Sequence, residues 1–138
     1  MEEIKNILKN AKNLALYGAS TNREKDSYKV MEYLQKNGYQ VFPINSLTDQ
    51  KYILGERVYK KLEEIDIDVD ILNIFRPSFE ILEISKKVIK KNNFKTVWLQ
   101  LGIFCFESKK ILEENGINFI YNKCTKKEHL NHLIKINL

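Results

Sequence analysis

The sequence predicts an α/β fold, with a doubly wound, mostly parallel five-stranded sheet and helices on both faces. Short apolar runs alternate along the chain with amphipathic helical segments, which is the pattern of repeated βα units. The apolar runs are rich in Ile, Leu and Val and mostly lack polar alternation, as is typical of strands buried on both faces. Three helical segments end in Asn-Gly or Asn-Asn, residues that tolerate the left-handed conformation common at helix ends.

The elements follow in order along the chain. Five apolar runs are expected to form the strands, at residues 14–17, 39–44, 69–75, 96–101 and 118–121. Helices are expected where apolar residues recur at helical spacing, at residues 3–11, 27–37, 78–92, 107–115 and 126–135. Residues 46–64 are less regular, and their Gly55 and Val58-Tyr59 pair predict a small turn before a short helix at 60–65.

The composition is that of a globular protein. A chain of 138 residues with 43% hydrophobic residues is long enough to bury a core, so we expect one domain over residues 1–138. Its apolar runs are too short to cross a membrane, and its first residues lack the pattern of a secretory signal. Because it also has just two cysteines, Cys105 and Cys124, we expect a protein of the reducing cytoplasm.

Charge and motif content exclude several classes of function. The net charge of +5 comes mainly from lysine, with acidic residues interspersed, so the sequence disfavours nucleic acid as a partner. Its two histidines, His129 and His132, lack acidic or thiol residues at metal-ligand spacing. The sequence offers no Ser–His–Asp order and no P-loop lysine. We therefore assign no catalytic residue or metal ligand, and favour a binding module over an enzyme.

Candidate site residues follow the predicted strands, because ligands of such sheets lie beyond the carboxyl ends of the strands. The loop after the first strand begins Gly18-Ala19-Ser20, where small residues allow a ligand to approach the backbone. Arg23 and Lys25 lie in the same loop, and the next helix begins near Ser27 with free backbone N–H groups. This combination favours phosphate, although a plain βα turn with two surface cations is the alternative interpretation.

The same loop does not match a dinucleotide-binding motif. A GxGxxG pattern would need glycine at positions 20 and 23, which hold Ser20 and Arg23. The second strand ends at Asn45 instead of the acidic residue that would hold a ribose hydroxyl. A neutral strand end beside cations favours a nucleotide that carries an additional phosphate.

Six sequence blocks, between about residue 13 and residue 132, give the chain a specific resemblance. It resembles the small stand-alone CoA-binding proteins and the Rossmann-like CoA-binding domain of the succinyl-CoA synthetase alpha subunit. The matching blocks are Gly18-Ala19-Ser20 with Ser27-Tyr28-Lys29-Val30, Val41-Phe42-Pro43-Ile44-Asn45, Ile53-Leu54-Gly55, Val69-Asp70-Ile71 with Ile74-Phe75-Arg76, Trp98-Leu99-Gln100-Leu101-Gly102-Ile103, and Cys124 with Glu128-His129. The chain departs from the family at Ser46 and Pro77, where proline and arginine are common.

The resemblance implies coenzyme A as the cofactor and CoA or an acyl-CoA as the partner molecule. The residues it places around CoA are Gly18, Ala19, Ser20, Arg23, Lys25 and Ser27 at the phosphates, Asn45 to Ile53 at the adenine and ribose, Phe75, Arg76, Gln100 and Gly102 along the inner cleft, and Cys124 at the thiol. It leaves open a monomer or a homodimer, and a further protein partner.

Two other functions remain alternatives. Cys124 would serve an enzyme or redox partner in acyl-CoA or CoA-disulfide chemistry, if its thiol is accessible near Lys123, Lys126 and Lys127. As a small buried side chain it would have no such role. The fold and the positive charge also allow an NAD(P)-binding regulator.

Overall fold

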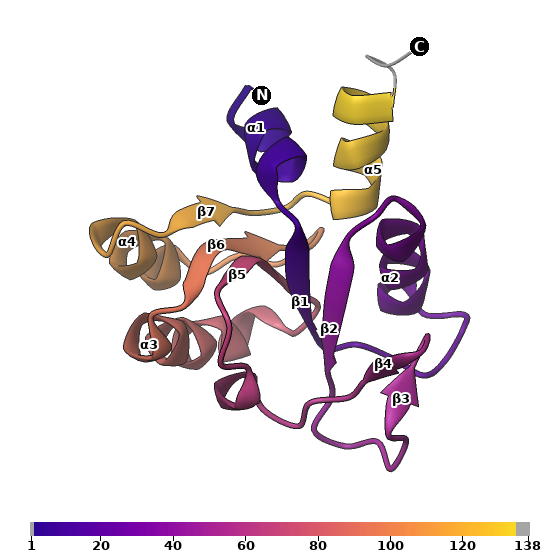
Figure 1. The fold of residues 1–138 in the computed structure, drawn as a ribbon. Coiled ribbons are helices and arrows are strands. Elements are labelled where there is room, and N and C mark those ends of the chain that lie inside the picture. The colour runs from indigo at the N-terminus through magenta and orange to yellow at the C-terminus, as the bar shows by residue number, and fades with distance from the viewer. Residues whose placement is uncertain (1, 135–138) are drawn as a thin grey trace.

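The computed structural model describes residues 2–134 and contains one five-stranded sheet in which every pairing is parallel. Its strands lie in the order β2-β1-β5-β6-β7 (Figure 1). Their bounds are Asn13–Tyr17 for β1, Gln40–Ile44 for β2, Val69–Ile74 for β5, Phe94–Leu99 for β6 and Asn118–Ile120 for β7. The predicted Rossmann-like α/β fold is confirmed.

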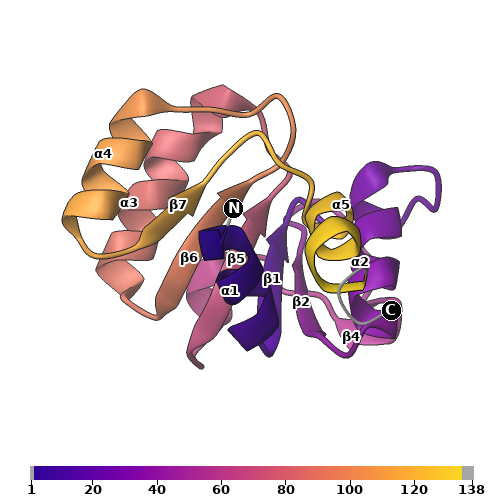
Figure 2. The same cartoon turned by 90° about the horizontal axis from the view of Figure 1, so that it is seen from above.

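Helices cover both faces of the sheet (Figure 2). On one face lie α1 (Glu2–Asn10), α2 (Asp26–Lys36) and α5 (Thr125–His129), which continues as a π-helical turn over Leu130–Ile134. On the other lie α3 (Ile81–Lys91) and α4 (Phe106–Glu114). Position 135 of the last predicted helix lies outside the described residues. Within the described part of the chain, the helices are too short or too polar to cross a membrane.

Two apolar cores form because successive strand residues point to opposite faces of the sheet. In β1, Leu14 and Leu16 pack toward α1 and α2, whereas Ala15 packs toward α3 and α4. Trp98 of β6 is fully buried in the first of these cores. The strands are therefore buried on both sides, as their unbroken apolar pattern indicates.

The helix ends also follow the sequence pattern. Gly38, just after α2, has a φ of 92°, and Asn92, at the end of α3, has a φ of 56°. Both therefore take the left-handed conformation expected from Asn-Gly and Asn-Asn at these junctions. The predicted helix at 78–92 begins with a 3-10 turn at Ser78–Glu80 before α3.

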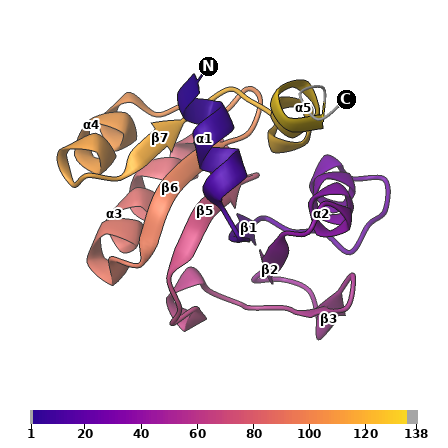
Figure 3. The same ribbon diagram turned by 45° about the horizontal axis from the view of Figure 1, so that its top comes forward.

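The irregular segment after β2 contains a hairpin that the sequence did not predict (Figure 3). Strands β3 (Tyr52–Ile53) and β4 (Glu56–Arg57) pair antiparallel, joined by two residues of positive φ, Leu54 and Gly55. Tyr59 then forms a parallel bridge with Ile44, which extends the edge of the sheet beyond β2. The short helix expected at 60–65 is a 3-10 turn at Leu62–Glu64.

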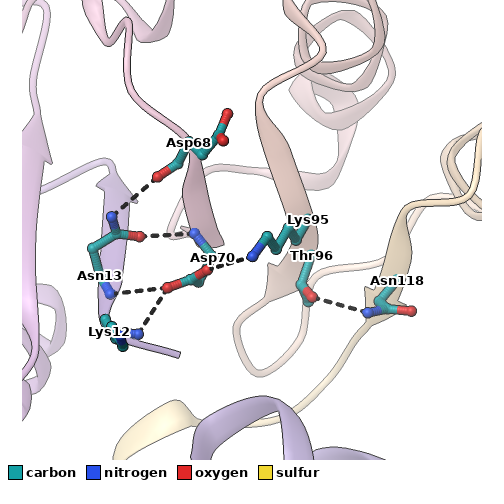
Figure 4. Close-up of polar contacts among 7 residues, drawn as sticks. All are labelled: Lys12, Asn13, Asp68, Asp70, Lys95, Thr96 and Asn118. Carbon is teal, nitrogen blue, oxygen red and sulfur yellow. Dashed lines mark hydrogen bonds and ion pairs between the residues drawn. The ribbon is translucent and has the colours of Figure 1, made fainter. Parts of the chain in front are cut away.

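Asp70 joins β1, β5 and β6 at the amino end of the sheet (Figure 4). Its Oδ2 accepts hydrogen bonds from the backbone N–H groups of Lys12 (2.7 Å) and Asn13 (3.3 Å), and its Oδ1 lies 3.3 Å from Lys95 Nζ. Burial raises the pKa of Asp70, but the hydrogen bonds and Lys95 together lower it below its ordinary value of 3.8. The charged carboxylate therefore stabilises the folded state.

We expect Asp70→Asn to lower the free energy of unfolding by about 1 kcal/mol at neutral pH, because the amide keeps the geometry but loses the charge. A lowered folded-state pKa means that this contribution is complete above about pH 4 and disappears as the pH falls through that pKa. Urea denaturation at several pH values measures the difference. Asp68→Asn, at an exposed carboxylate two residues away, is the control; an equal effect of both variants would contradict the role of Asp70.

Candidate functional site

The direction of the strand order changes between β1 and β5, and this is where ligands of such sheets bind. Gly18 follows β1 with a φ of 94°, and a Cβ at this position would lie 2.7 Å from the carbonyl oxygen of Phe75. The loops after the two strands therefore touch through a contact that only glycine permits. Gly18 thus allows the two loops to pack closely, in addition to the role expected from the sequence, which is to let a ligand approach the backbone.

A pocket of about 400 Å³ lies on the β2 side of this contact, and we call it the polar pocket. Its walls come from the loops that follow β1, β2 and β5 and from the residue after the Tyr59 bridge. The lining residues are Tyr17, Gly18, Ala19, Thr21, Ile44, Asn45, Ser46, Leu47, Thr48, Lys60, Arg76 and Glu80.

Asn45 shapes the polar pocket through its side chain. Its Nδ2 donates to the carbonyl oxygen of Ala19 at 2.8 Å, which joins the loops after β1 and β2. Its Oδ1 accepts the backbone N–H groups of Leu47 (2.8 Å) and Thr48 (2.9 Å). Because these bonds use both ends of the amide, Asn45 organises the loop that lines the polar pocket.

Two cations line the polar pocket, and they differ in how far protein groups compensate their charge. Arg76 forms a bidentate pair with Glu80, with distances of 3.1 Å from Nε and 2.6 Å from Nη2. The hydrogen bond to Glu80 raises the pKa of Arg76, and the carboxylate balances its charge. Lys60 donates from Nζ to the carbonyl oxygen of Thr48, a neutral acceptor. Lys60 therefore gives the pocket its positive charge.

A second pocket, of about 670 Å³, lies between α2 and α5, and we call it the apolar pocket. Most of its wall consists of aliphatic and aromatic side chains, with several lysines and one aspartate among them. The lining residues are Asp26, Lys29, Val30, Phe75, Arg76, Pro77, Gln100, Leu101, Ile103, Cys124, Lys126, Lys127 and Leu130. Arg76 lines both pockets, so the two adjoin at the exit of β5.

The segment that carries Cys124 is fixed from both sides. Trp98 Nε1 donates to the carbonyl oxygen of Lys123 at 2.9 Å, and the Thr125 hydroxyl donates to Asn73 Oδ1 at 2.9 Å. Cys124 is 8% exposed and lines the apolar pocket. Its thiol is therefore held at the wall of the pocket with little freedom to move.

The end of α5 is also held against α2. His129 is buried, and its Nδ1 lies 2.8 Å from the hydroxyl oxygen of Tyr33. Burial lowers the pKa of His129, so the ring is neutral at neutral pH. This contact fixes the wall of the apolar pocket that α5 supplies.

The structure brings together about half of the residues that the sequence placed at the site. Those lining one or both pockets are Gly18, Ala19, Asn45, Phe75, Arg76, Gln100 and Cys124. Arg23 and Lys25 are exposed and do not line either pocket. Ile53 packs in a core, and the Gly102 N–H donates to Asn122 Oδ1 at 2.9 Å.

Two serines from the first loop and helix also lie outside both pockets. The Ser20 hydroxyl oxygen accepts the backbone N–H of Asn22 at 3.0 Å, which shapes the loop. Ser27 is buried in the first turn of α2.

The sequence did not indicate Lys60 as a lining residue, whereas the stretch from Asn45 to Ile53 that it placed at the site includes Thr48. Lys60 reaches the polar pocket because Tyr59 N–H donates to the carbonyl oxygen of Pro43 at 2.9 Å. The β-prone pair Val58-Tyr59 was the available signal, but its pairing partner depends on the tertiary fold.

We expect Gly18→Ala to lower the free energy of unfolding by about 2 kcal/mol, because the new Cβ would collide with the Phe75 carbonyl oxygen at a left-handed position. Urea denaturation measures this loss. Gly55→Ala is the matched control, since Gly55 has a φ of 81° and a Cβ there meets nothing within 4 Å. If the two variants lose equal stability, backbone strain alone accounts for the loss in Gly18→Ala, and the contact with Phe75 contributes nothing.

Comparison with known proteins agrees with this geometry. The chain is 32% identical to the uncharacterized protein YneT of Bacillus subtilis over 127 residues, which are 92% of each chain. The solved structure of cell-free ID.343 from Thermus thermophilus superposes with a TM-score of 0.90 at 31% identity, over 96% of this chain and 98% of that one.

A larger protein matches over a shorter stretch. The ADP-forming acetate–CoA ligase of Methanocaldococcus jannaschii is 29% identical over 80 residues, which are 58% of this chain and 11% of the ligase. The model of the CoA binding domain family matches residues 12–130, which include every strand of the sheet and the residues of both pockets. The chain therefore belongs to the family of CoA-binding domains.

Proposed function

We propose that this protein is a small CoA-binding module, in which residues 1–138 form one domain that binds CoA or an acyl-CoA without transforming it. The observation that carries this proposal is the pair of adjoining pockets, one polar and one apolar, that meet at Arg76. CoA has the same two-part chemistry, because a phosphorylated nucleotide is joined through a pyrophosphate to a long, largely uncharged pantetheine arm.

The polar pocket suits the nucleotide end of CoA. Lys60 supplies a positive charge for a phosphate, and the loop held by Asn45 surrounds the space. A pyrophosphate at the junction would meet Arg76 and compete with Glu80 for its guanidinium. The arm would then enter the apolar pocket between α2 and α5 and point toward Cys124.

Other observations support the proposal. The family to which the chain belongs is described as a CoA binding domain, and the archaeal relative is named as a ligase of acetate and CoA. Cys105 and Cys124 are both free thiols, which fits the reducing cytoplasm as the place where the protein acts.

We expect the protein to bind CoA more tightly than dephospho-CoA in isothermal titration calorimetry, because the polar pocket would pair with the additional phosphate. Lys60→Met should weaken CoA binding about tenfold by removing a charged partner of a phosphate. Lys61→Met, at an exposed lysine outside both pockets, is the matched control. Equal affinity of the wild type for the two ligands, or equal loss in the two variants, would contradict the proposal.

A second candidate function uses the thiol of Cys124, because the structure holds it at the wall of the apolar pocket. In this function the Cys124 thiolate attacks a CoA disulfide, forms a mixed disulfide with CoA and releases the second thiol as the leaving group. No other oxidant is needed, because the disulfide bond is exchanged.

For this second function, incubation with oxidised CoA should add the mass of one CoA to the protein, and a reductant should remove it. Native and denaturing mass spectrometry measure the adduct. Cys124→Ser should abolish the covalent adduct while binding of reduced CoA persists, and Cys105→Ser should retain both. An adduct that persists in Cys124→Ser would exclude Cys124 as the thiol.

A further inference from the structure

Gln100 is a buried amide at the inner end of the apolar pocket. It follows β6, is 7% exposed and lines this pocket. Its backbone is held on both sides, because its N–H donates to the carbonyl oxygen of Ile74 and its carbonyl oxygen accepts the N–H of Ile103, each at 3.2 Å. The position of the side chain is therefore set by the sheet.

A chain of hydrogen bonds fixes which end of the Gln100 amide faces the pocket. Asn73 Nδ2 lies 3.3 Å from the backbone carbonyl oxygen of Trp98, which accepts hydrogen bonds only, so this end of the Asn73 amide is the nitrogen. Thr125 Oγ1 donates to the other end, Oδ1, at 2.9 Å. The same Asn73 Nδ2 donates to Gln100 Oε1 at 3.1 Å.

The orientation of Asn73 thus determines the polarity of Gln100. Because Oε1 is turned to Asn73, the amide nitrogen is the end that faces the pocket. Among residues 2–134, Nε2 has no hydrogen-bond partner, and it is not one of the fully enclosed atoms. A ligand that enters the pocket displaces solvent from this donor, so a ligand with an acceptor at this position is favoured over one without.

We propose that Gln100 is a specificity-determining residue whose Nε2 donates to a neutral carbonyl oxygen of the ligand in the apolar pocket. In a CoA ligand this carbonyl is either an amide of the pantetheine arm or the thioester of an acyl group. Asn73 and Thr125 are positioning residues, since they act on the ligand through Gln100. The inference rests on the proposed function, because the ligand is CoA or an acyl-CoA.

The test reverses the polarity of this contact. Gln100→Glu keeps an oxygen for Asn73 Nδ2 but replaces the donor with a second acceptor. We expect calorimetry at about pH 8 to show binding of acetyl-CoA, which carries both kinds of carbonyl, weakened about tenfold. Binding of 3′-phosphoadenosine 5′-diphosphate, which lacks the pantetheine arm, should be unchanged. Gln40→Glu, at an exposed position that begins the edge strand β2, should alter the binding of neither ligand.

Lowering the pH distinguishes this role from a structural one. Burial raises the pKa of a carboxyl group, so toward about pH 5 the new carboxyl becomes protonated and regains a donor. The acetyl-CoA affinity of Gln100→Glu should then recover relative to the wild type at the same pH. Gln100→Met has no group that titrates and should lose acetyl-CoA affinity equally at both pH values. This second variant also tests the inference if Gln100→Glu does not fold.

Comparison of CoA with acetyl-CoA identifies the carbonyl. If Gln100 binds a pantetheine amide, the substitution weakens both ligands by the same factor; if it binds the thioester, acetyl-CoA loses more. Unchanged CoA and acetyl-CoA affinity in Gln100→Glu and Gln100→Met would overturn this inference and leave the proposed function intact. A wild-type protein that binds none of these ligands would overturn the proposed function, and the inference with it.

Discussion

The constraint on which the site depends is the burial of the Asn73 amide near the carboxyl end of β5. A side chain with no exposed surface must find hydrogen-bond partners inside the protein. Asn73 finds them in the Trp98 carbonyl, the Gln100 amide and the Thr125 hydroxyl. These partners belong to the end of β6 and the start of α5. One buried amide therefore joins three elements that surround the apolar pocket and sets the direction of its polar group.

Much of the fold was predictable because it depends on local patterns. Strands such as Val69–Ile74 are mostly apolar, with single polar residues between the apolar ones. Helices such as Ile81–Lys91 show one apolar face. The hairpin at β3 and β4 was not predicted. Its two turn residues are Leu54 and Gly55, and leucine is rarely found with a positive φ, so the usual Asn-Gly or Asp-Gly signal is missing.

About half of the candidate site was predictable from the rule that ligands meet strand ends. This rule found Gly18, Arg76 and Gln100, whose positions depend only on where a strand stops. It could not find Lys60, which arrives through a long-range bridge. Nor does the rule show that Arg23 lies outside both pockets, because spacing in the sequence does not determine the direction of an exposed loop side chain. The sequence did not indicate a role for Asn73, because it is a single polar residue near the end of an apolar run.

The hairpin and the α5 junction differ in how firmly they are attached, and this difference bears on how such a protein diversifies. The loop that delivers Lys60 joins the sheet at the Ile44–Tyr59 bridge and packs against the core through Ile53 and Val58. The segment around Cys124 is tied to Trp98 and Asn73 in the core. Changes in the length of the loop that delivers Lys60 can therefore be taken up between its contacts, whereas a change in the segment around Cys124 breaks hydrogen bonds to the core.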